Sequence, residues 1–403
     1  MVKGMASIKY WVWLSAQTGV SPAAKAALLR HYGDVEAAFF APSGEYCRIK
    51  GVSAGDAAVL EGRDMSGVEN ILAECRRLDI RPVTMRDADY PRRLRNIFAP
   101  PAVIYVKGRL PELDDEAAIA VIGTRKASPY GLKMGSRLAY EIVKCGGIVV
   151  SGLTSGVDAA AARGALMADG VCIGVLGTSH EQEKGRLAQD VAARGALISE
   201  YPPGTQPLRS HFRDRNRITA GISVGVAVVE APEKSGALLF AAEANEQGKE
   251  IFAVPGNVDA PNSAGTISLM QEGAKPVRTG WDILCEFEAL FPEKLQPAEN
   301  VEMPDIGKNQ AETGEIEAES GKKGIDKEKS RGYIDLKEQL AQLSEEQLRI
   351  ISAIDKGASH IDDVIENTGL STPKVLAQLT VLEIKGFIKR EPGKRISLNT
   401  AKK

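Results

Sequence analysis

The chain has 403 residues, of which 43% are apolar and 26% charged, and its formal net charge is −2. This length exceeds one ordinary hydrophobic core and the composition is that of a soluble globular protein, so we expect two to four folded domains. A nearly neutral chain cannot hold nucleic acid through its bulk charge, and any such binding must come from a local basic patch.

The cysteines, histidines and apolar runs exclude several further classes of protein. The five cysteines are scattered without a CxxC pair, which is typical of reduced thiols in a cytosolic protein. The four histidines lack metal-ligand spacing. No apolar run reaches about 18 residues, and the first apolar stretch is broken by Ser15 and Gln17, as in a folded helix and unlike a signal peptide. We therefore expect a cytoplasmic protein with no membrane span, no metal and no cofactor.

Residues 1–78 are predicted to form a small helical module of the SAM or helix-hairpin-helix kind. The stretch "GVSPAAKAALLRHYG" carries a cap signal at Ser21-Pro22 and a stop signal at Gly33, and "GVSAGDAAVLEG" has a similar layout. Such modules bind DNA or partner proteins, but most are packing units. The sequence leaves these alternatives open.

Residues 79–292 are predicted to form an α/β core. A helix between the first two strands is marked by Ser128 as N-cap and Pro129 as first residue. Continuous apolar runs that alternate with helical segments indicate an extended Rossmann-like, doubly wound parallel sheet. The six apolar runs are "AAIAVIG", "IVVSG", "VCIGVLG", "ALISEY", "VGVAVVE" and "EIFAVPG".

The last 111 residues divide into a polar segment and a second folded domain. Residues 293–337 are charged and nearly without large apolar groups, which predicts a flexible linker. Residues 338–403 read as three helices and a hairpin that turns at Pro392-Gly393. This order is that of a winged-helix domain, with a helix-turn-helix around Thr368-Gly369.

The loops after the strands form the candidate site, because open α/β sheets bind ligands at the carboxyl ends of their strands. Several of these loops are rich in Gly and Ser and open helices, so their backbone N–H groups could cradle phosphate. The predicted phosphate loops contain Gly123, Ser128, Gly152 and Gly156, and the cationic or helix-opening groups beside them are Arg125, Lys126, Lys234, Ser235 and Gly236.

The stretch "HFRDRNRITAGIS" adds three arginines at every second position before the fifth predicted strand. If the segment is extended, Arg213, Arg215 and Arg217 lie on one side. If Asp214 caps a helix, Arg215 and Arg217 fall in the first turn, where the helix dipole disfavours cations unless an anion is close. Either geometry indicates a phosphate-facing patch, and a solvated basic turn is the plain alternative.

A complete catalytic set is not found in the sequence. There is no GxGxxG after the first strand, no GxxxxGK[ST], and no GxSxG serine with a base beside it. Asp158 and Glu230 follow strands, where carboxylates are more often helix caps than catalysts. A phosphate-rich pocket of this kind favours binding of a polymer or a nucleotide over catalysis.

Taken together, the motifs resemble the DNA-processing protein A family (DprA, also called Smf). The segment from Asp87 to Gly108 also looks like the one that precedes the family's core. Any single motif is weak, but seven in the same order are specific, and the flanking domains are similar too. The seven are "IGTRKASPYG", "SGLTSGVDAAAARGAL", "VLGT", "ISEYPPGTQP", "FRDRNRITAGIS", "VVEAPEKSGALLFAAEA" and "IFAVPG".

The resemblance implies a non-enzymatic homodimer that binds single-stranded DNA in a basic pocket and hands it to the RecA recombinase during natural transformation, in competent cells. Carried over by position, the DNA-contacting residues would be Arg125 of a GSR-like motif, Arg215, Asn216 and Arg217 of an RNR motif, and Ser235 and Gly236 of an SG pair that opens a phosphate-side helix.

Three positions depart from the family pattern. Ser155 replaces the usual arginine, Ala162 replaces a histidine, and Arg213 stands where the family has proline. Loss of one pocket arginine should weaken phosphate affinity, and Arg213 could restore that charge.

Two other interpretations stay open at this point. The first is a nucleotide-binding or nucleotide-hydrolysing enzyme on a related sheet, although "PGNVDAPNSAGT" lacks the contiguous PGGxGTxxE loop and its glutamate. The second concerns the winged helix, whose third helix offers Lys374 and Lys385. That helix could read duplex DNA or contact a protein.

Overall fold

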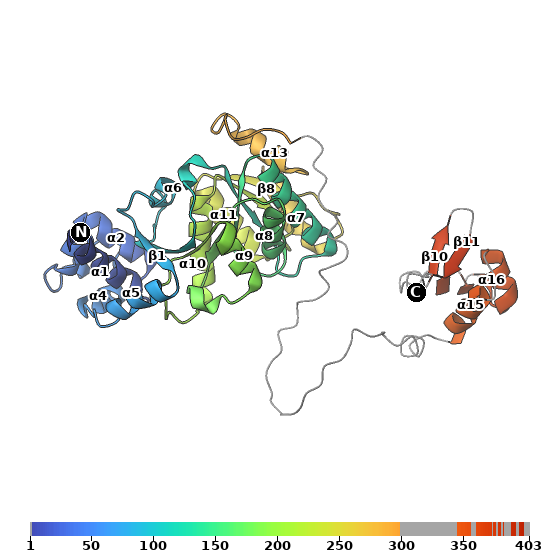
Figure 1. Ribbon diagram of the computed structural model, residues 1–403, viewed down its shortest axis with the longest axis horizontal. Coiled ribbons are helices and arrows are strands. Elements are labelled where there is room, and N and C mark those ends of the chain that lie inside the picture. The colour runs from blue at the N-terminus through green and yellow to red at the C-terminus, as the bar shows by residue number, and fades with distance from the viewer. Residues whose placement is uncertain are drawn as a thin grey trace, which may run out of the picture. The chain divides into compact units, whose positions relative to one another are not determined.

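The computed structural model describes residues 2–298 and, nearer the C-terminus, 345–355, 360–372, 374–375, 378–379, 382, 388–391 and 395–398. The chain divides into two compact units, 1–311 and 312–403 (Figure 1). Residues 299–337, most of the predicted linker, lie outside the described residues. The three domain boundaries expected from the sequence, after residues 78, 292 and 337, stay predictions.

A nine-stranded sheet forms the centre of the first unit, in the order β1-β2-β6-β5-β4-β3-β7-β8-β9. The seven strands β3 to β9 are parallel to their neighbours within this group. At one edge, β2 pairs antiparallel with β6, and β1 pairs antiparallel with β2. The six predicted strands are present as β3 to β8, so the predicted doubly wound α/β class is confirmed. The bounds are β1 Ile80–Thr84, β2 Val103–Gly108, β3 Ala118–Ile122, β4 Ile148–Ser151, β5 Cys172–Leu176, β6 Ala196–Ser199, β7 Gly225–Val228, β8 Glu250–Ala253 and β9 Lys275–Pro276.

Two separate hydrophobic cores lie on the two faces of this sheet, and β3 shows why. Its five residues are all buried; Ile119 and Val121 join one core, while Ala118, Ala120 and Ile122 join the other. The first core is covered by α7 (Pro129–Lys144), α8 (Val157–Met167), α9 (Arg186–Arg194) and α13 (Gly280–Leu284), and the second by α6 (Arg92–Arg95), α10 (Arg209–Ile222), α11 (Gly236–Glu246) and α12 (Ala264–Gln271) (Figure 1).

The helix signals at α7 are confirmed. The Ser128 hydroxyl accepts the backbone N–H of Gly131, Pro129 is the first helical residue, and the helix ends at Lys144 just before Gly146, which has φ +92°. The cap satisfies an N–H that has no partner inside the helix, and the glycine adopts a left-handed conformation that a side chain would disfavour.

Both geometries considered for the arginine stretch are wrong. The segment is helical, and α10 begins at Arg209, five residues before Asp214. No side chain caps its N-terminus, where Leu208 is the capping residue. Burial of Ile218, Ala220 and Ile222 against the sheet stabilises the helix despite the missing cap.

The helical module is present as α1 (Val2–Ala16), α2 (Pro22–Tyr32), α3 (Val35–Phe39), α4 (Ala54–Glu61) and α5 (Val68–Arg77). The predicted cap at Ser21 and left-handed stop at Gly33 are confirmed. The core of the module continues onto the sheet, since Ile80, Val103 and Tyr105 belong to it and the Tyr105 hydroxyl lies 2.7 Å from that of Ser15. The module thus packs directly on β1 and β2.

The second unit contains α15 (Glu345–Asp355), α16 (Ile361–Thr368) and an antiparallel pair, β10 (Ile388–Glu391) with β11 (Arg395–Leu398). Gly369, with φ +66°, follows α16 at the predicted helix-turn-helix. The predicted hairpin turn at Pro392-Gly393 lies outside the described residues. Across the parts of both units that the structure describes, no helix is long and apolar enough to cross a membrane.

Candidate nucleic-acid interface

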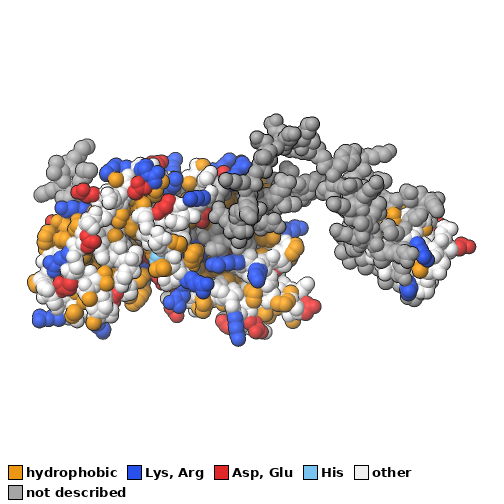
Figure 2. All heavy atoms as spheres, turned by 90° about the horizontal axis from the view of Figure 1, so that it is seen from below, with side chains coloured by type: hydrophobic (Ala, Val, Ile, Leu, Met, Phe, Trp, Pro, Cys, Tyr) orange, Lys and Arg blue, Asp and Glu red, His pale blue; other side chains and the backbone are white. Residues whose placement is uncertain are grey.

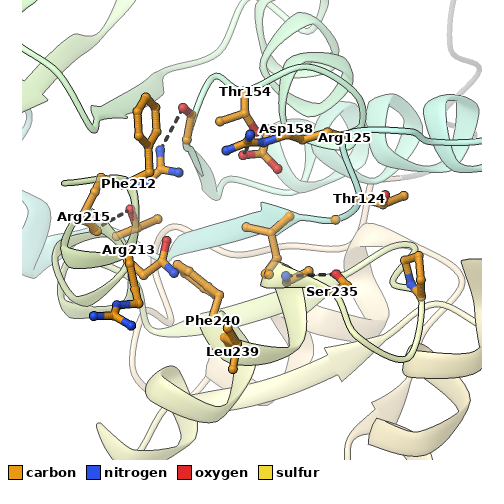
Figure 3. A pocket seen from close by; sticks show the side chains of 18 of the residues that line it. Thr124, Arg125, Thr154, Asp158, Phe212, Arg213, Arg215, Ser235, Leu239 and Phe240 are labelled. Atoms are coloured by element: carbon orange, nitrogen blue, oxygen red, sulfur yellow. Dashed lines mark hydrogen bonds between the residues drawn. The ribbon is translucent and has the colours of Figure 1, made fainter. Parts of the chain in front are cut away.

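An open cleft of about 530 Å³ lies at the carboxyl edge of the sheet (Figure 3). The loops after β3, β4 and β7 supply part of its wall, and α10, the start of α11 and Asp158 of α8 supply further groups. Its position agrees with the rule that placed the predicted site at the strand ends. The lining groups include Gly123, Thr124, Arg125, Gly152, Thr154, Asp158, Arg209, Phe212, Arg213, Arg215, Asn216, Thr219, Lys234, Ser235, Gly236, Leu239 and Phe240.

Four exposed cations line the cleft: Arg125, Arg209, Arg213 and Lys234. Within the described residues, none of them forms an ion pair or donates a side-chain hydrogen bond, and the Arg125 guanidinium lies 5.9 Å from the Phe212 ring centre. On the face shown in Figure 2, Lys and Arg side chains form several separate groups among apolar, polar and acidic ones. The cleft therefore concentrates positive charge that the protein itself does not neutralise.

An apolar surface lies beside these cations. Phe212 of α10 and Leu239 of α11 contribute to it, and Leu239 is 65% exposed although it is a large apolar side chain. Phe240 also lines the cleft but is only 4% exposed. Cations next to exposed apolar groups match the two parts of a nucleic-acid strand, since phosphates need charge and unpaired bases need a surface to stack on.

The N-terminus of α11 opens into the cleft. Ser235 caps the helix by accepting the backbone N–H of Ala237 at 3.0 Å. A Cβ placed on Gly236 would meet no heavy atom within 4 Å, so the space beside this first helical residue is open. Unpaired N–H groups and the positive end of the helix dipole make this terminus suited to an anion.

The N-terminus of α7, in contrast, is already occupied. The Glu230 carboxylate accepts both the backbone N–H of Ser128, at 2.9 Å, and the Ser128 hydroxyl. The sequence predicted that Ser128 lies in a phosphate loop. Its donors are satisfied by an internal carboxylate, and the residue is not in the cleft wall.

Two arginines of α10 are buried and paired inside the protein. Arg215 lies at the inner end of the cleft, and its Nη1 donates to the carbonyl oxygens of Gly152 and Val175, both at 2.8 Å. Burial lowers the pKa of Arg215 below its ordinary value, and the nearby Asp158 acts in the opposite direction.

Arg217 lies outside the cleft wall, and its Nη2 donates to both oxygens of Glu200, at 2.5 and 2.7 Å. Burial alone would lower the pKa of Arg217, but the Glu200 carboxylate raises it above its ordinary value. The family resemblance implied that Arg217 contacts DNA. In the structure its guanidinium is hydrogen-bonded to Glu200.

Asp158 is a carboxylate at the base of the cleft, in the first turn of α8. It accepts the Thr154 hydroxyl at 2.9 Å, and its burial raises its pKa. Arg215 and Arg125 act in the opposite direction on that pKa. Within the described part of the chain, no group of three or more His, Cys, Asp or Glu side chains could hold a metal ion.

Comparison with known proteins now gives the family. A model of DNA recombination-mediator protein A matches residues 81–288, and a model of the DprA winged helix domain matches residues 335–394. The chain belongs to the DNA recombination-mediator protein A family. The resemblance identified from seven motifs and from the winged-helix pattern is thus confirmed.

Individual relatives support the same assignment over most of the chain. Protein Smf of Synechocystis sp. is 31% identical over 398 residues, covering 96% of this chain and 97% of that protein. DNA processing protein DprA of Bacillus subtilis is 40% identical over 233 residues, covering 57% and 77% respectively. The X-ray structure of DprA from Streptococcus pneumoniae matches with a TM-score of 0.61 and 31% identity, over 70% of this chain and 98% of that one.

The cleft brings together most, but not all, of the residues predicted for a DprA-like site. Four predicted residues lie outside the cleft wall: the exposed Lys126, the half-buried Ser128 and Gly156, and the buried Arg217. Gly156 has φ +81°, and a Cβ there would lie 2.3 Å from the Thr124 carbonyl oxygen, so this glycine permits two loops to meet. The predicted residues found in the wall are Gly123, Arg125, Gly152, Arg213, Arg215, Asn216, Lys234, Ser235 and Gly236.

The sequence analysis missed Arg209, Phe212 and Thr219, which line the cleft from α10. Together with Arg213 and Asn216 they lie three or four positions apart, the spacing of one helix face. An extended segment or a helix starting at Asp214 excludes the first two residues. A predicted helix that begins at Arg209 would have placed all five residues on one face.

Proposed function

We propose that this chain is a non-enzymatic recombination mediator that binds single-stranded DNA in the cleft. The proposal rests on three cations that have no ion-pair partner among the described residues, Arg125, Arg213 and Lys234. They lie beside an open helix terminus and the apolar side chains of Phe212 and Leu239. The family description, a DNA recombination mediator, agrees with this chemistry.

In this proposal the DNA phosphates are held by charge and by backbone N–H groups. Arg125 approaches from the β3 loop, Arg213 from α10 and Lys234 from the loop before α11. The α11 N-terminus supplies N–H donors at Gly236. Arg213 supplies a charge where the family has proline, which offsets the arginine missing at Ser155.

The apolar surface favours a single strand over a duplex. Unpaired bases can stack on Phe212 or pack on Leu239, whereas the bases of a duplex are stacked and paired inside the double helix. The duplex would still meet the cations, so its binding should be weaker and should depend on charge alone.

Several finer parts of the proposal rest on family resemblance. They are the homodimer, delivery of the strand to RecA, a role in natural transformation and a cytoplasmic location. Each stays a prediction. Single-strand binding is the step that the cleft geometry addresses directly, and it is the first to test.

The test is fluorescence anisotropy of a labelled poly-dT oligonucleotide, first single-stranded and then as a duplex, across a salt series. We expect clear preference for the single strand and an affinity that falls with salt. Arg125→Ala should weaken binding roughly tenfold and lower the slope of log affinity against log salt by about 0.7, the value for one phosphate contact on a single strand. Lys126→Ala is the control, since Lys126 is exposed beside the cleft but outside its wall.

Equal losses in the two variants would mean that only diffuse charge matters, and equal affinity for single strand and duplex would contradict the role of the apolar surface. No binding at low salt would reject the proposal. In that case a nucleotide screen by thermal stabilisation, followed by assay for a released base, would examine the enzymatic alternative.

A further inference from the structure

Glu230 lies just beyond β7 and is only 4% exposed. A buried carboxylate requires hydrogen-bond donors, and this one has three: the Ser128 N–H, the Ser128 hydroxyl and the side-chain amide of Asn262 at 3.2 Å. All three come from other segments of the chain. Glu230 therefore joins parts of the structure that are far apart in sequence.

The bonds of Glu230 hold both ends of the loop that carries Arg125. Its backbone carbonyl accepts the N–H of Thr124 at 2.8 Å, one residue before Arg125. Its carboxylate accepts the N–H of Ser128, three residues after Arg125. The loop from Thr124 to Ser128 is thus tied at each end to a single residue.

Asn262 provides a third attachment. Its amide donates to the Lys126 carbonyl at 3.1 Å as well as to Glu230. The packing is tight as well, since a Cβ on Gly131 would lie 2.2 Å from a Glu230 carboxylate oxygen, and one on Gly123 would lie 2.9 Å from its carbonyl oxygen. The loop backbone is held on both sides of Arg125, while the guanidinium itself forms no hydrogen bond with described protein groups.

We propose that Glu230 is a positioning residue that presents Arg125 to a DNA phosphate, an inference that rests on the proposed single-strand binding. A loop fixed before the ligand arrives loses less conformational freedom on binding, so each contact that it makes is stronger. The same carboxylate fills the N-terminus of α7. A DNA phosphate can therefore bind to Arg125 and to the open N-terminus of α11, but not to the N-terminus of α7.

The matched control is Glu141, another buried carboxylate of the same compact unit. It is 5% exposed, lies in the later half of α7, and accepts the backbone N–H of Gly280 at 2.7 Å and the Nε of Arg137. Glu141→Ala removes a carboxylate of similar burial and bonding at a position that does not line the cleft. It should lower thermal stability and leave DNA affinity within about twofold of the original chain.

The experiment is a double-mutant cycle on the full chain with labelled poly-dT. Glu230→Ala should weaken binding roughly tenfold in the original chain but less than twofold in an Arg125→Ala background, since it acts through Arg125. Glu230→Gln, which keeps one acceptor oxygen, should give an intermediate loss and serves if the alanine variant does not fold. Backbone hydrogen exchange without DNA should rise across residues 124–128 in Glu230→Ala and not in Glu141→Ala.

Equal losses in the two backgrounds would overturn the positioning role, because Glu230 would then act independently of Arg125. A gain in affinity in Glu230→Gln would also overturn it, by indicating that phosphate enters the freed α7 terminus. An original chain that does not bind poly-dT rejects the proposed function itself. An original chain that binds but shows no coupling rejects only the inference about Glu230.

Discussion

Helices α7 and α11 both begin at the carboxyl edge of the sheet, but what lies at their N-termini differs. At α7, the Glu230 carboxylate accepts the donors of Ser128. At α11, the space around Gly236 is empty within 4 Å of a Cβ. The two helices have the same type of cap, a serine, so the cap residue alone does not make an anion site. The site depends on whether the protein has already supplied the anion.

The arginines near this edge divide in the same way. Arg215 and Arg217 are buried and hydrogen-bonded to protein oxygens, whereas Arg125 and Arg213 are exposed in the cleft and have no protein acceptor among the described residues. The first pair holds α10 in place, and the second pair is available to a ligand. Variants that exchange these two situations test the comparison.

The largest effect is expected for Arg217→Ala, and it should be on stability. Removing the guanidinium leaves Glu200 buried without its charged partner, which we expect to lower the free energy of unfolding of the α/β unit by about 3–5 kcal/mol. Arg213→Ala, on the same helix but exposed, should change that free energy by less than about 0.5 kcal/mol while weakening DNA binding. Denaturant unfolding of the full chain measures the first quantity and oligonucleotide anisotropy the second.

The combined change Arg217→Met with Glu200→Leu is the control, because it removes both charges and should recover much of the lost stability. If Arg217→Ala were as stable as the original chain but had a smaller salt slope in DNA binding, Arg217 would be a direct phosphate contact. The division between buried and available arginines would then be wrong.

The next largest effect is expected when α11 is made to imitate α7. Gly236→Asp would place a carboxylate at the open terminus, where a Cβ is sterically accommodated. A like charge close to a bound phosphate should weaken DNA binding by about 1–3 kcal/mol, or roughly 5- to 150-fold, with the greater loss at low salt. Gly236→Asn has nearly the same shape without the charge and should change affinity much less. Equal losses for the two variants in anisotropy would attribute the effect to shape.

The sequence predicted the parts of the fold that depend on local pattern. Continuous apolar runs marked β3 to β8, and caps at Ser21 and Ser128 marked α2 and α7. Three strands, β1, β2 and β9, were not predicted: "IRPVT" mixes polar and apolar residues, β9 has only two residues, and the apolar run of β2 was not assigned to a strand. β1 and β9 are the edge strands of the sheet, and they form by pairing with β2 and β8, which a local sequence pattern does not specify.

The site was predicted in location but less well in detail. The edge of the sheet followed from topology, and most loop residues there line the cleft. The start of α10 was missed because Leu208 gives no cap signal. The partnership of Arg217 with Glu200, and of Ser128 with Glu230, joins residues 17 and 102 positions apart, and no local pattern specifies it. These pairs determine which charged groups and helix N-termini at the sheet edge are available to a ligand.

The smallest effect is expected when the two capping serines are removed in turn. Ser128→Ala and Ser235→Ala each delete one cap, so each should lower the free energy of unfolding by about 1 kcal/mol. Only Ser235→Ala should also weaken DNA binding, by roughly two- to fivefold, because its hydroxyl orders the first turn that faces phosphate. In Ser128→Ala the backbone N–H still donates to Glu230, so the Arg125 loop keeps its attachment and affinity should be unchanged. If Ser128→Ala weakened binding as much as Ser235→Ala at equal stability, phosphate would be reaching α7, and the two helices would not differ in the way that their N-termini indicate.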